Sequence, residues 1–300
     1  MPTISLDLPE SFFNEEIRSG YTVTKDRKEL WAVELDLLFQ LDEICRKHGL
    51  SYMLGAGSLL GVIRHKGFIP WDDDIDIYML RRDYDKLISC WHELKEPYFL
   101  QSGYTEREYV RKHAQLRNSH TTAFCQGEEN WDVNRGVFID IFPIDGIPDS
   151  EIDYFRQERT DKWFDKWWTY YFRKNCKSTL QVIKRAIIRF LSRIIGKNTV
   201  FRAMEKNLSH YSKPDTKMWG NRTIHFDCPR SRRPLEDYTN LTTGEFEGFQ
   251  VPIPVNYDAM LRQQYGDYMK IPEIKPASIH GELTVSTSVS YRDYLKKREN

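Results

Sequence analysis

The stretch that decides the fold is Trp71-Asp72-Asp73-Asp74-Ile75-Asp76-Ile77-Tyr78-Met79. From Asp74 onward polar and apolar residues alternate, which is typical of a strand with one buried face. Residues two apart on a strand face the same side, so Asp74 and Asp76 are expected to project together while the isoleucines enter the core. Two carboxylates this close repel each other unless a cation lies between them. Magnesium prefers such oxygens and binds one or two carboxylates together with substrate phosphates, although acidic turns without a metal are also common.

Upstream of this stretch we expect a helix, a short strand and a glycine turn. Apolar residues recur at three- and four-residue steps over Lys25–His48, which predicts an amphipathic helix. Residues 52–54 read as a strand that enters the turn, after which Ser58 is expected to cap a helix over 59–64. A turn of this kind presents backbone N–H groups and a helix dipole to an anion. Gly57 and Ser58 are therefore candidate phosphate-binding residues.

Downstream of the acidic stretch, helical spacing returns over 82–94. Three further strands are expected, at 98–100, 109–116 and 136–142. The last of them carries a single acid, Asp140, among apolar residues, and a buried carboxylate is costly unless it is paired or bound to metal. This order of elements predicts a mixed α/β fold (α+β), in which residues 22–150 form the catalytic core.

The composition changes after residue 150. Aromatic residues crowd into 163–172, and every charged residue from Lys166 to Arg202 is basic. Because apolar residues also recur here at helical spacing, we interpret residues 151–218 as a helical insertion and residues 219–300 as the part that completes the catalytic domain. The basic stretch has the composition of a helix that lies at a lipid interface. The alternative is a subdomain that packs its aromatic residues inward.

The overall composition limits the class of protein. Lys and Arg balance Asp and Glu at 44 each, which argues against nucleic acid as a partner. Five scattered cysteines favour a reducing, cytoplasmic location over a disulfide framework. The start of the chain lacks the features of a signal peptide and no apolar run reaches the length of a membrane span. We therefore expect at most a peripheral contact with the inner face of the cell membrane.

Three blocks of the sequence resemble the LicD family, which includes bacterial phosphocholine transferases and is similar to the fukutin-type ribitol-phosphate transferases. The first block runs from Gly57 to Asp76 and the second from Gly136 to Gly146; the third begins at Tyr265. A glycine-serine turn, an Asp-x-Asp strand and a later strand with one acid are also the pattern of the nucleotidyltransferase (polymerase β-like) fold. The expected core is a mixed sheet with flanking helices.

The resemblance implies metal-dependent transfer of phosphocholine, or a related phospho-alcohol, from a CDP-activated donor such as CDP-choline. The acceptor would be a sugar hydroxyl of a cell-surface glycan or lipid-linked oligosaccharide, such as a teichoic acid, lipopolysaccharide or capsule precursor. Asp74 and Asp76 would hold Mg²⁺ or Mn²⁺. Asp140 would complete the metal site or accept the proton of the attacking hydroxyl, and the sequence leaves both roles open.

The resemblance also implies contacts to the donor and its phosphates. Candidates are Gly57, Ser58, Arg64, His65, Lys66, Arg117 and Thr121. Gln115 stands where the family tends to carry a lysine. Aromatic side chains would form a cage for choline, in which cation–π attraction contributes about 0.5 to 2 kcal/mol per contact. Candidates for the cage are Trp71, Tyr78, Trp131 and Phe142, for which core packing is the alternative. Tyr265 is interpreted as a packing residue.

Two other functions remain open at this point. A nucleotidyltransferase that moves a nucleoside monophosphate onto a small molecule or sugar would use the same carboxylates and differ only in which phosphorus is attacked. A catalytically inactive module that binds glycans or membranes would rely on the basic insertion. The presence of Asp74, Asp76 and Asp140 together argues against this last reading.

Overall fold

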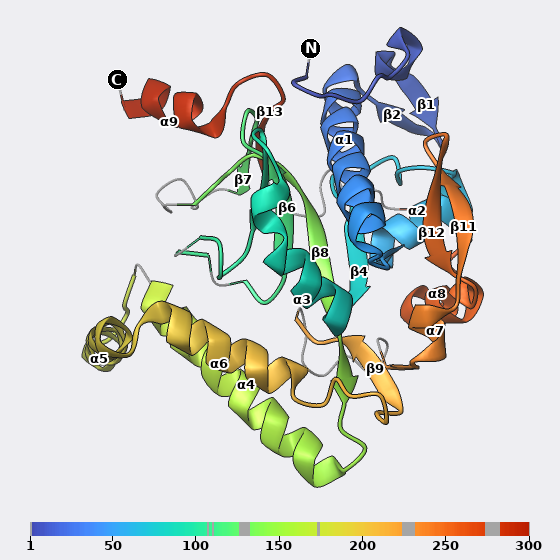
Figure 1. The fold of residues 1–300 in the computed structure, drawn as a ribbon. Coiled ribbons are helices and arrows are strands. Elements are labelled where there is room, and N and C mark those ends of the chain that lie inside the picture. Colours follow the sequence, from blue (N-terminus) through green and yellow to red (C-terminus); the bar gives the residue numbers. More distant parts are fainter. Residues whose placement is uncertain are drawn as a thin grey trace.

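A mixed β-sheet flanked by helices forms the centre of the molecule (Figure 1). The computed structural model describes residues 2–106, 108–109, 111–125, 133–172, 175–223, 232–273 and 283–299. The sheet has seven strands: β3 (Met53–Leu54), β4 (Asp76–Leu80), β5 (Tyr98–Gln101), β6 (Ala114–Asn118), β8 (Val137–Ile147), β9 (Met218–Asn221) and β10 (Arg233–Pro234). The mixed α/β fold that the sequence predicts is thereby confirmed.

The long strand β8 organises this sheet. One edge of β8 pairs in parallel with β4, which in turn pairs antiparallel with β3. Two strands share the other edge of β8. Its first half pairs antiparallel with β6, which pairs in turn with β5. Its second half pairs antiparallel with β9, which pairs in turn with β10. A single strand therefore brings segments from both halves of the chain together.

Two helices cover one face of the sheet, α1 (Lys25–His48) and α3 (Arg81–Ser89) (Figure 1). Helix α1 begins at Thr24, whose side chain accepts a hydrogen bond from the Arg27 amide, and ends at Gly49 in the left-handed conformation. Alternate residues of β4 and β8 pack against these helices in one apolar core: Ile77, Met79, Ile139 and Ile141. The intervening residues of these strands therefore face the other side.

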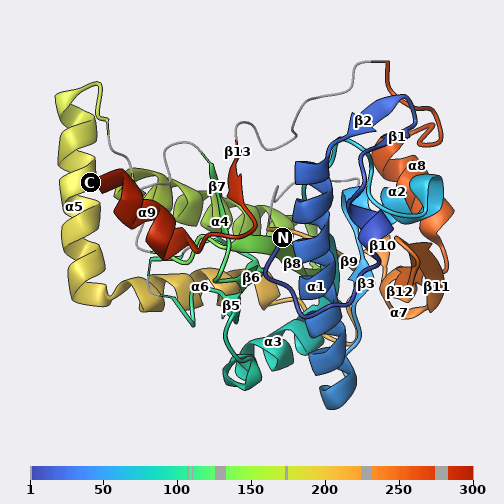
Figure 2. The same ribbon diagram turned by 90° about the horizontal axis from the view of Figure 1, so that it is seen from above.

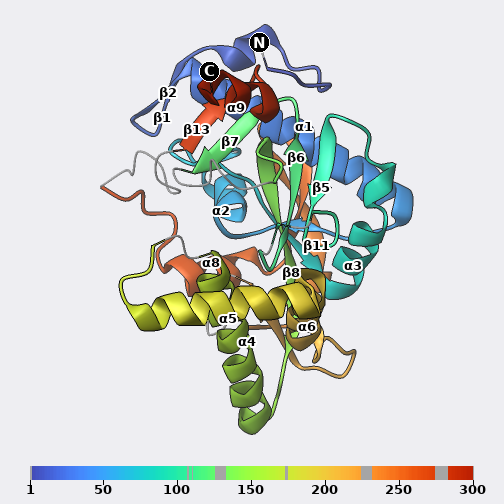
Figure 3. The ribbon, with the colours of Figure 1, turned by 90° about the vertical axis from the view of Figure 1, so that its left-hand side faces the viewer.

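The end of the sheet near β3 is covered by a group of smaller elements. They are α2 (Ala56–His65), α7 (Glu236–Thr239), α8 (Tyr257–Tyr265), and the hairpin of β11 (Leu241–Phe246) and β12 (Phe249–Pro254). Near the amino terminus lie a 3₁₀ turn, Glu10–Phe13, and a second hairpin of β1 (Glu16–Arg18) and β2 (Tyr21–Val23). A further 3₁₀ turn, Trp91–Glu93, follows α3. The C-terminal β13 (Leu283–Ser286) pairs with β7 (Thr122–Cys125) and leads to α9 (Tyr291–Glu299). Both chain termini therefore lie at one end of the molecule (Figure 3).

Residues 151–218 are largely helical, as the sequence predicts. They form α4 (Glu151–Phe172), α5 (Thr179–Ile195) and α6 (Lys197–Ser209), which pack around a separate apolar cluster that includes Trp167, Trp168 and Phe201. Among the described residues, no helix is long and apolar enough to cross a membrane.

The observed elements correct several predicted boundaries. The helix predicted over Lys25–His48 is confirmed. The helix expected over 82–94 ends at Ser89, and the strand expected from residue 109 begins at Ala114. Helix α2 begins before Ser58, so the prediction that Ser58 caps it is wrong. The residue at the cap position is Gly55. The Ser58 hydroxyl instead accepts a hydrogen bond from the Asp76 amide.

Candidate active site

One row of residues crosses four strands of the sheet on the face turned away from α1 and α3. The register pairs Asp76 of β4 with Asp140 of β8, Asp140 with Gln115 of β6, and Gln115 with Gln101 of β5. Residues that oppose each other on neighbouring strands point to the same face. The sheet therefore aligns two carboxylates and two amides in one line.

Three carboxylates meet at the end of this row. Asp74, Asp76 and Asp140 each offer an oxygen, and these oxygens lie within 4.8 Å of one another. Asp72, Asp73 and Asp74 form a second, overlapping group at the same spacing. Several hard oxygen donors at such distances are the ligand set that Mg²⁺ prefers. The predicted residues therefore fit a divalent cation by their chemistry.

The start of α2 supports this cluster. The Ser58 hydroxyl accepts a hydrogen bond of 2.8 Å from the Asp76 amide, and the Gly55 amide donates to the Asp76 carbonyl at 2.9 Å. Gly57 lies directly against the carboxylates: a Cβ atom there would be 2.9 Å from Asp72 Oδ2. A residue without a side chain thus lets the helix start approach the acids. Because the Ser58 side chain is buried, its observed role is to position Asp76.

Helix α1 holds the acidic loop from behind. Both Arg27 and Trp31 donate hydrogen bonds to the Asp72 carbonyl, at 2.9 and 3.1 Å. Glu34 is buried beneath the loop, and its pKa is raised well above the usual value by burial first and then by the charges of the loop aspartates. These influences favour the neutral form of Glu34, which adds no further negative charge to the cluster.

Asp140 is held by two neighbours. The Gln115 side chain donates a hydrogen bond of 2.7 Å to Asp140 Oδ1, and His113 Nε2 lies 3.1 Å from the same oxygen. Burial alone raises the pKa of Asp140, but the charges of His113 and Arg111 and the hydrogen bonds from His113 and Gln115 outweigh it, leaving the pKa below its usual value. Asp140 is therefore ionised at neutral pH, as both a metal ligand and a proton acceptor require.

Comparisons with known proteins agree with this arrangement. Residues 49–190 match the family model described as LicD/FKTN/FKRP, nucleotidyltransferase domain. The chain is also 29% identical over 253 residues to the lipopolysaccharide cholinephosphotransferase LicD of Haemophilus influenzae, a match that covers 82% of this chain and 92% of that protein. Residues 49–190 therefore carry a LicD family domain.

A shorter match links the chain to a second bacterium. It is 38% identical over 113 residues to an uncharacterized protein of Rickettsia prowazekii, covering 38% of this chain and 39% of that protein. The longer LicD family domain at 49–190 contains the first two sequence blocks and all three aspartates of the candidate site.

Two residues expected from the LicD resemblance to contact the donor are engaged elsewhere. Arg117 donates to the Gln101 and Gln115 side chains and to the Gly136 carbonyl, and its guanidinium lies over the Phe138 ring at 4.6 Å. Burial is the main reason that its pKa falls to about 10. Arg117 therefore supports Gln115, which in turn holds Asp140.

Thr121 is also part of a turn rather than of an open surface. Its hydroxyl donates to the Asn118 carbonyl at 2.7 Å and accepts from the Val137 amide at 2.8 Å. The side chain is fully buried. A donor molecule would reach it only if this turn opened.

The three basic residues at the C-terminal end of α2 differ in their contacts and charge. Arg64 donates to the Tyr268 carbonyl at 2.8 Å and to His65 Nε2 at 2.9 Å. Burial, followed by the charge of Arg64, lowers the pKa of His65 to about 4, so that this ring is neutral near pH 7. Lys66 is exposed at the end of the helix. Within this triplet, the positive charge is therefore carried by Arg64 and Lys66.

The predicted cage residues lie in two places. Tyr78 and Phe142 pair across β4 and β8, two residues beyond Asp76 and Asp140 on the same face, with ring centroids 6.1 Å apart. The Phe142 ring also contacts His113 at 4.6 Å. Trp71 is buried and contacts other rings, those of Tyr21 and His65. Trp131 lies outside the described residues.

The sequence reasoning missed two site residues. His113 precedes β6, where no pattern distinguishes it. Tyr265 of α8 was interpreted as packing, yet its pKa is raised by burial first and then by the negative charges of Tyr78, Asp76, Asp72 and Asp74. Its phenol is therefore within electrostatic range of the carboxylate cluster. The position of Tyr265 at the start of the third sequence block was the signal that could have found it.

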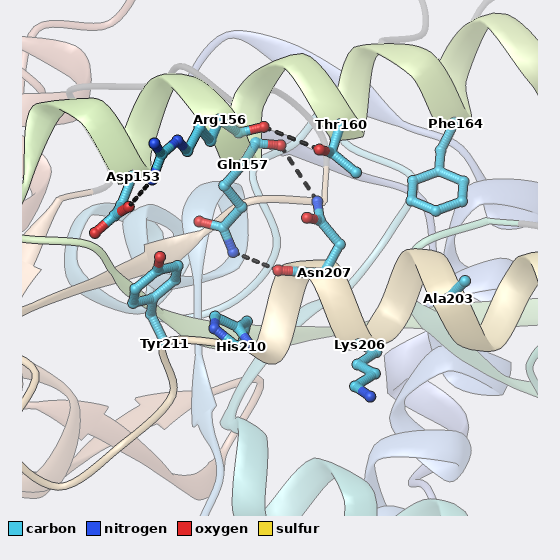
Figure 4. Close-up of a pocket in the computed structure, with 10 residues that line it drawn as sticks. All are labelled: Asp153, Arg156, Gln157, Thr160, Phe164, Ala203, Lys206, Asn207, His210 and Tyr211. Carbon is cyan, nitrogen blue, oxygen red and sulfur yellow. Dashed lines mark hydrogen bonds and ion pairs between the residues drawn. The ribbon is translucent and has the colours of Figure 1, made fainter.

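One well-formed cavity lies away from these residues. A space of about 360 Å³ opens between α4 and α6, where the Gln157 side chain bonds to the Asn207 carbonyl (Figure 4). Among the described residues that line it, none belongs to the predicted site. The cavity is therefore separate from the carboxylate cluster.

Proposed function

We propose that this chain transfers phosphocholine, or a related phospho-alcohol, from a CDP-activated donor to a hydroxyl of a cell-surface glycan. The convergence of Asp74, Asp76 and Asp140 carries the proposal, since a phosphoryl-transfer enzyme mainly positions its substrates and neutralises charge. The name of the relative from Haemophilus influenzae, a lipopolysaccharide cholinephosphotransferase, supports choline and a glycan as the two substrates. We also assign the sheet to the nucleotidyltransferase (polymerase β-like) type.

Asp74, Asp76 and Asp140 would hold Mg²⁺ or Mn²⁺. When bound there, such a cation supplies neutralising charge for the diphosphate of the donor. The chain itself keeps these ligands in place, because Ser58 holds the Asp76 backbone and Gln115 holds the Asp140 carboxylate. A preorganised site of this kind loses little energy to reorganisation during the reaction.

The proposed reaction exchanges one oxygen–phosphorus bond for another. The glycan hydroxyl oxygen forms a bond to the phosphorus that carries choline, the bond from that phosphorus to CMP breaks, and CMP leaves. The proton of the hydroxyl needs an acceptor, and Asp140 is ionised and lies in the row with Asp76. The positive charge of Arg64 and Lys66 suits the CMP that leaves.

We place the recognition of choline in the row of the sheet next to the carboxylates. Tyr78 and Phe142 place two aromatic rings beside the carboxylates on the same face. A quaternary ammonium group is attracted to such rings. We propose these two residues, rather than Trp71, as the aromatic contact for choline, because they follow Asp76 and Asp140 on the same face of the sheet.

A panel of donors tests the proposed function. The purified chain is incubated with a lipopolysaccharide acceptor and with CDP-choline, CDP-ethanolamine, CDP-glycerol or CDP-ribitol, each with Mg²⁺ or with EDTA. We expect Mg²⁺-dependent release of CMP, fastest with CDP-choline. A parallel incubation contains CTP in place of these donors. Release of pyrophosphate from CTP, without CMP release from any of the CDP-alcohols, would instead establish transfer of a nucleoside monophosphate.

A further inference from the structure

Helix α5 leaves a stripe of apolar side chains exposed. The five residues recur at three- and four-residue steps, and each is at least half exposed: Leu180 60%, Ile183 50%, Ile187 51%, Phe190 63% and Ile194 68%. Within α5, whose residues are all described, only Ser192 is buried, and its hydroxyl accepts a hydrogen bond from the Trp167 indole at 3.1 Å. The helix therefore packs against its neighbours through a narrow side and turns its apolar stripe outward.

The place of α5 in the molecule makes this stripe accessible. Figure 2 shows α5 at the edge of the molecule, across from α2, α8 and the β11–β12 hairpin. Its partners are α4 and α6. A contiguous apolar patch of this kind on a protein surface marks an interaction site.

Every charged residue of α5 is basic. At 100° per residue, Lys184 falls to one side of it and Arg193 to the other, and the sequence has no acidic residue from Lys166 to Met204. A cavity of about 420 Å³ adjoins the stripe at Phe190 and is lined by Arg189, Arg193 and Lys197 together with Tyr171. Lys197 is ion-paired with Glu108, so Arg189 and Arg193 supply the positive charge of this cavity. Apolar and cationic groups thus lie next to each other on one surface.

The charge decides which partner suits this surface. Two copies of α5 that met along their stripes would bring Lys184 and Arg193 against their own like charges, which disfavours pairing. A helix with an apolar stripe flanked by Lys and Arg is suited to an anionic bilayer, where the basic side chains reach the phosphates.

We propose that α5 lies on an anionic lipid bilayer, with its apolar stripe among the acyl chains and a lipid phosphate in the adjoining cavity, bound by Arg189 and Arg193. This contact would hold the enzyme beside glycans that are built on lipid carriers. It goes beyond the proposed transfer reaction and does not depend on it, since it uses none of the residues of the carboxylate site.

Cosedimentation with vesicles tests this proposal without any substrate. We expect the chain to bind vesicles of phosphatidylcholine mixed with phosphatidylglycerol, to release them at high ionic strength, and not to bind phosphatidylcholine alone. Arg189→Glu with Arg193→Glu should weaken binding about tenfold or more. Ile183→Ser with Ile187→Ser should weaken it to a similar extent, because both side chains are exposed and can be replaced without disturbing the core.

A matched control reverses two exposed charges on α3, Arg82→Glu with Lys86→Glu, which should leave vesicle binding unchanged. All variants should release CMP from a soluble donor at the parental rate. Absence of binding to anionic vesicles at low ionic strength, or equal loss in the control, would overturn the proposal. The proposal would also be overturned if the parent chain bound no vesicles but formed dimers in sedimentation velocity, and if Ile183→Ser with Ile187→Ser abolished those dimers. The stripe would then be an interface between copies of the chain.

Discussion

At the scale of single residues, the candidate site depends on charge held at short range. Asp74, Asp76 and Asp140 bring oxygens within 4.8 Å of one another. Their mutual repulsion is tolerated in the folded chain because Gln115 and His113 hold Asp140 and Ser58 holds the backbone at Asp76. The raised pKa of Glu34 behind the loop favours its neutral form and so limits further negative charge.

Removing one of these charges should abolish turnover without unfolding the protein. Asp74→Asn and Asp76→Asn keep the side-chain volume but remove a charged metal ligand, so we expect each to lower kcat at least about a hundredfold, or about 2.7 kcal/mol in activation free energy. The measurement is CMP release, with circular dichroism as the check on folding. Asp215→Asn, at an exposed position, is the control and should keep full activity. If both site variants kept more than about a tenth of the activity, the metal assignment would be wrong.

Tyr78 should distinguish between choline and smaller donors. Tyr78→Leu removes a ring beside Phe142, and a cation–π contact of about 0.5 to 2 kcal/mol corresponds to a rise of about 2- to 30-fold in KM for CDP-choline. The rise should be smaller for CDP-ethanolamine, and Tyr78→Phe, which retains the ring, should resemble the parent. Equal effects of Tyr78→Leu on both donors would show that the ring serves packing alone.

At the scale of elements, a buried ionic cluster joins α3, β8 and α6. Arg81 donates two hydrogen bonds to Asp145, at 2.8 and 2.7 Å, and lies 3.4 Å from Glu205. Asp145 also accepts a hydrogen bond from Ser212. All three charged side chains are buried. The cluster thus connects the helical insertion to the strand that carries Asp140.

Breaking this cluster should destabilise the fold. Arg81→Met leaves Asp145 and Glu205 buried without their cation, which typically costs about 3 to 5 kcal/mol. The measurement is the free energy of unfolding in urea. The neighbouring Arg82 has an exposed side chain, so Arg82→Met should change stability by less than about 0.5 kcal/mol. A small effect of Arg81→Met, equal to that of Arg82→Met, would show that the cluster contributes little to stability.

At the scale of the whole molecule, the carboxylate cluster joins distant parts of the chain, so cation binding should stabilise the entire fold. A ligand that binds only the folded state adds about 2.7 kcal/mol when its concentration is a hundred times its Kd. We expect Mg²⁺ to raise the midpoint of thermal unfolding of the parent chain and to have little effect on Asp76→Asn. The same concentration of Na₂SO₄, which lacks the divalent cation, is the control. An equal shift in parent and variant would mean that Mg²⁺ acts elsewhere.

Local patterns in the sequence were sufficient for several elements. The helix Lys25–His48 and the alternation after Asp74 were predicted because apolar periodicity and a terminal glycine act within one element. The acidic motif and the single acid of the later strand also indicated Asp74, Asp76 and Asp140, which the structure brings together, since acids are unusual on a buried strand. The family resemblance that these motifs indicated is confirmed by the comparisons.

The sequence by itself thus determined the main helices, the acidic strand and the family. Only the tertiary structure decided which distant residues meet. The parallel register places Asp140 beside Asp76, and the fold brings His113 and Tyr265 near these acids. It also engages Arg117 and Thr121 in hydrogen bonds within the protein. It also decided that the stripe of α5 is exposed, since a helical pattern does not say which neighbour covers it. The reason is that strand pairing and helix packing depend on contacts between residues far apart in the chain, whose energies no local pattern records.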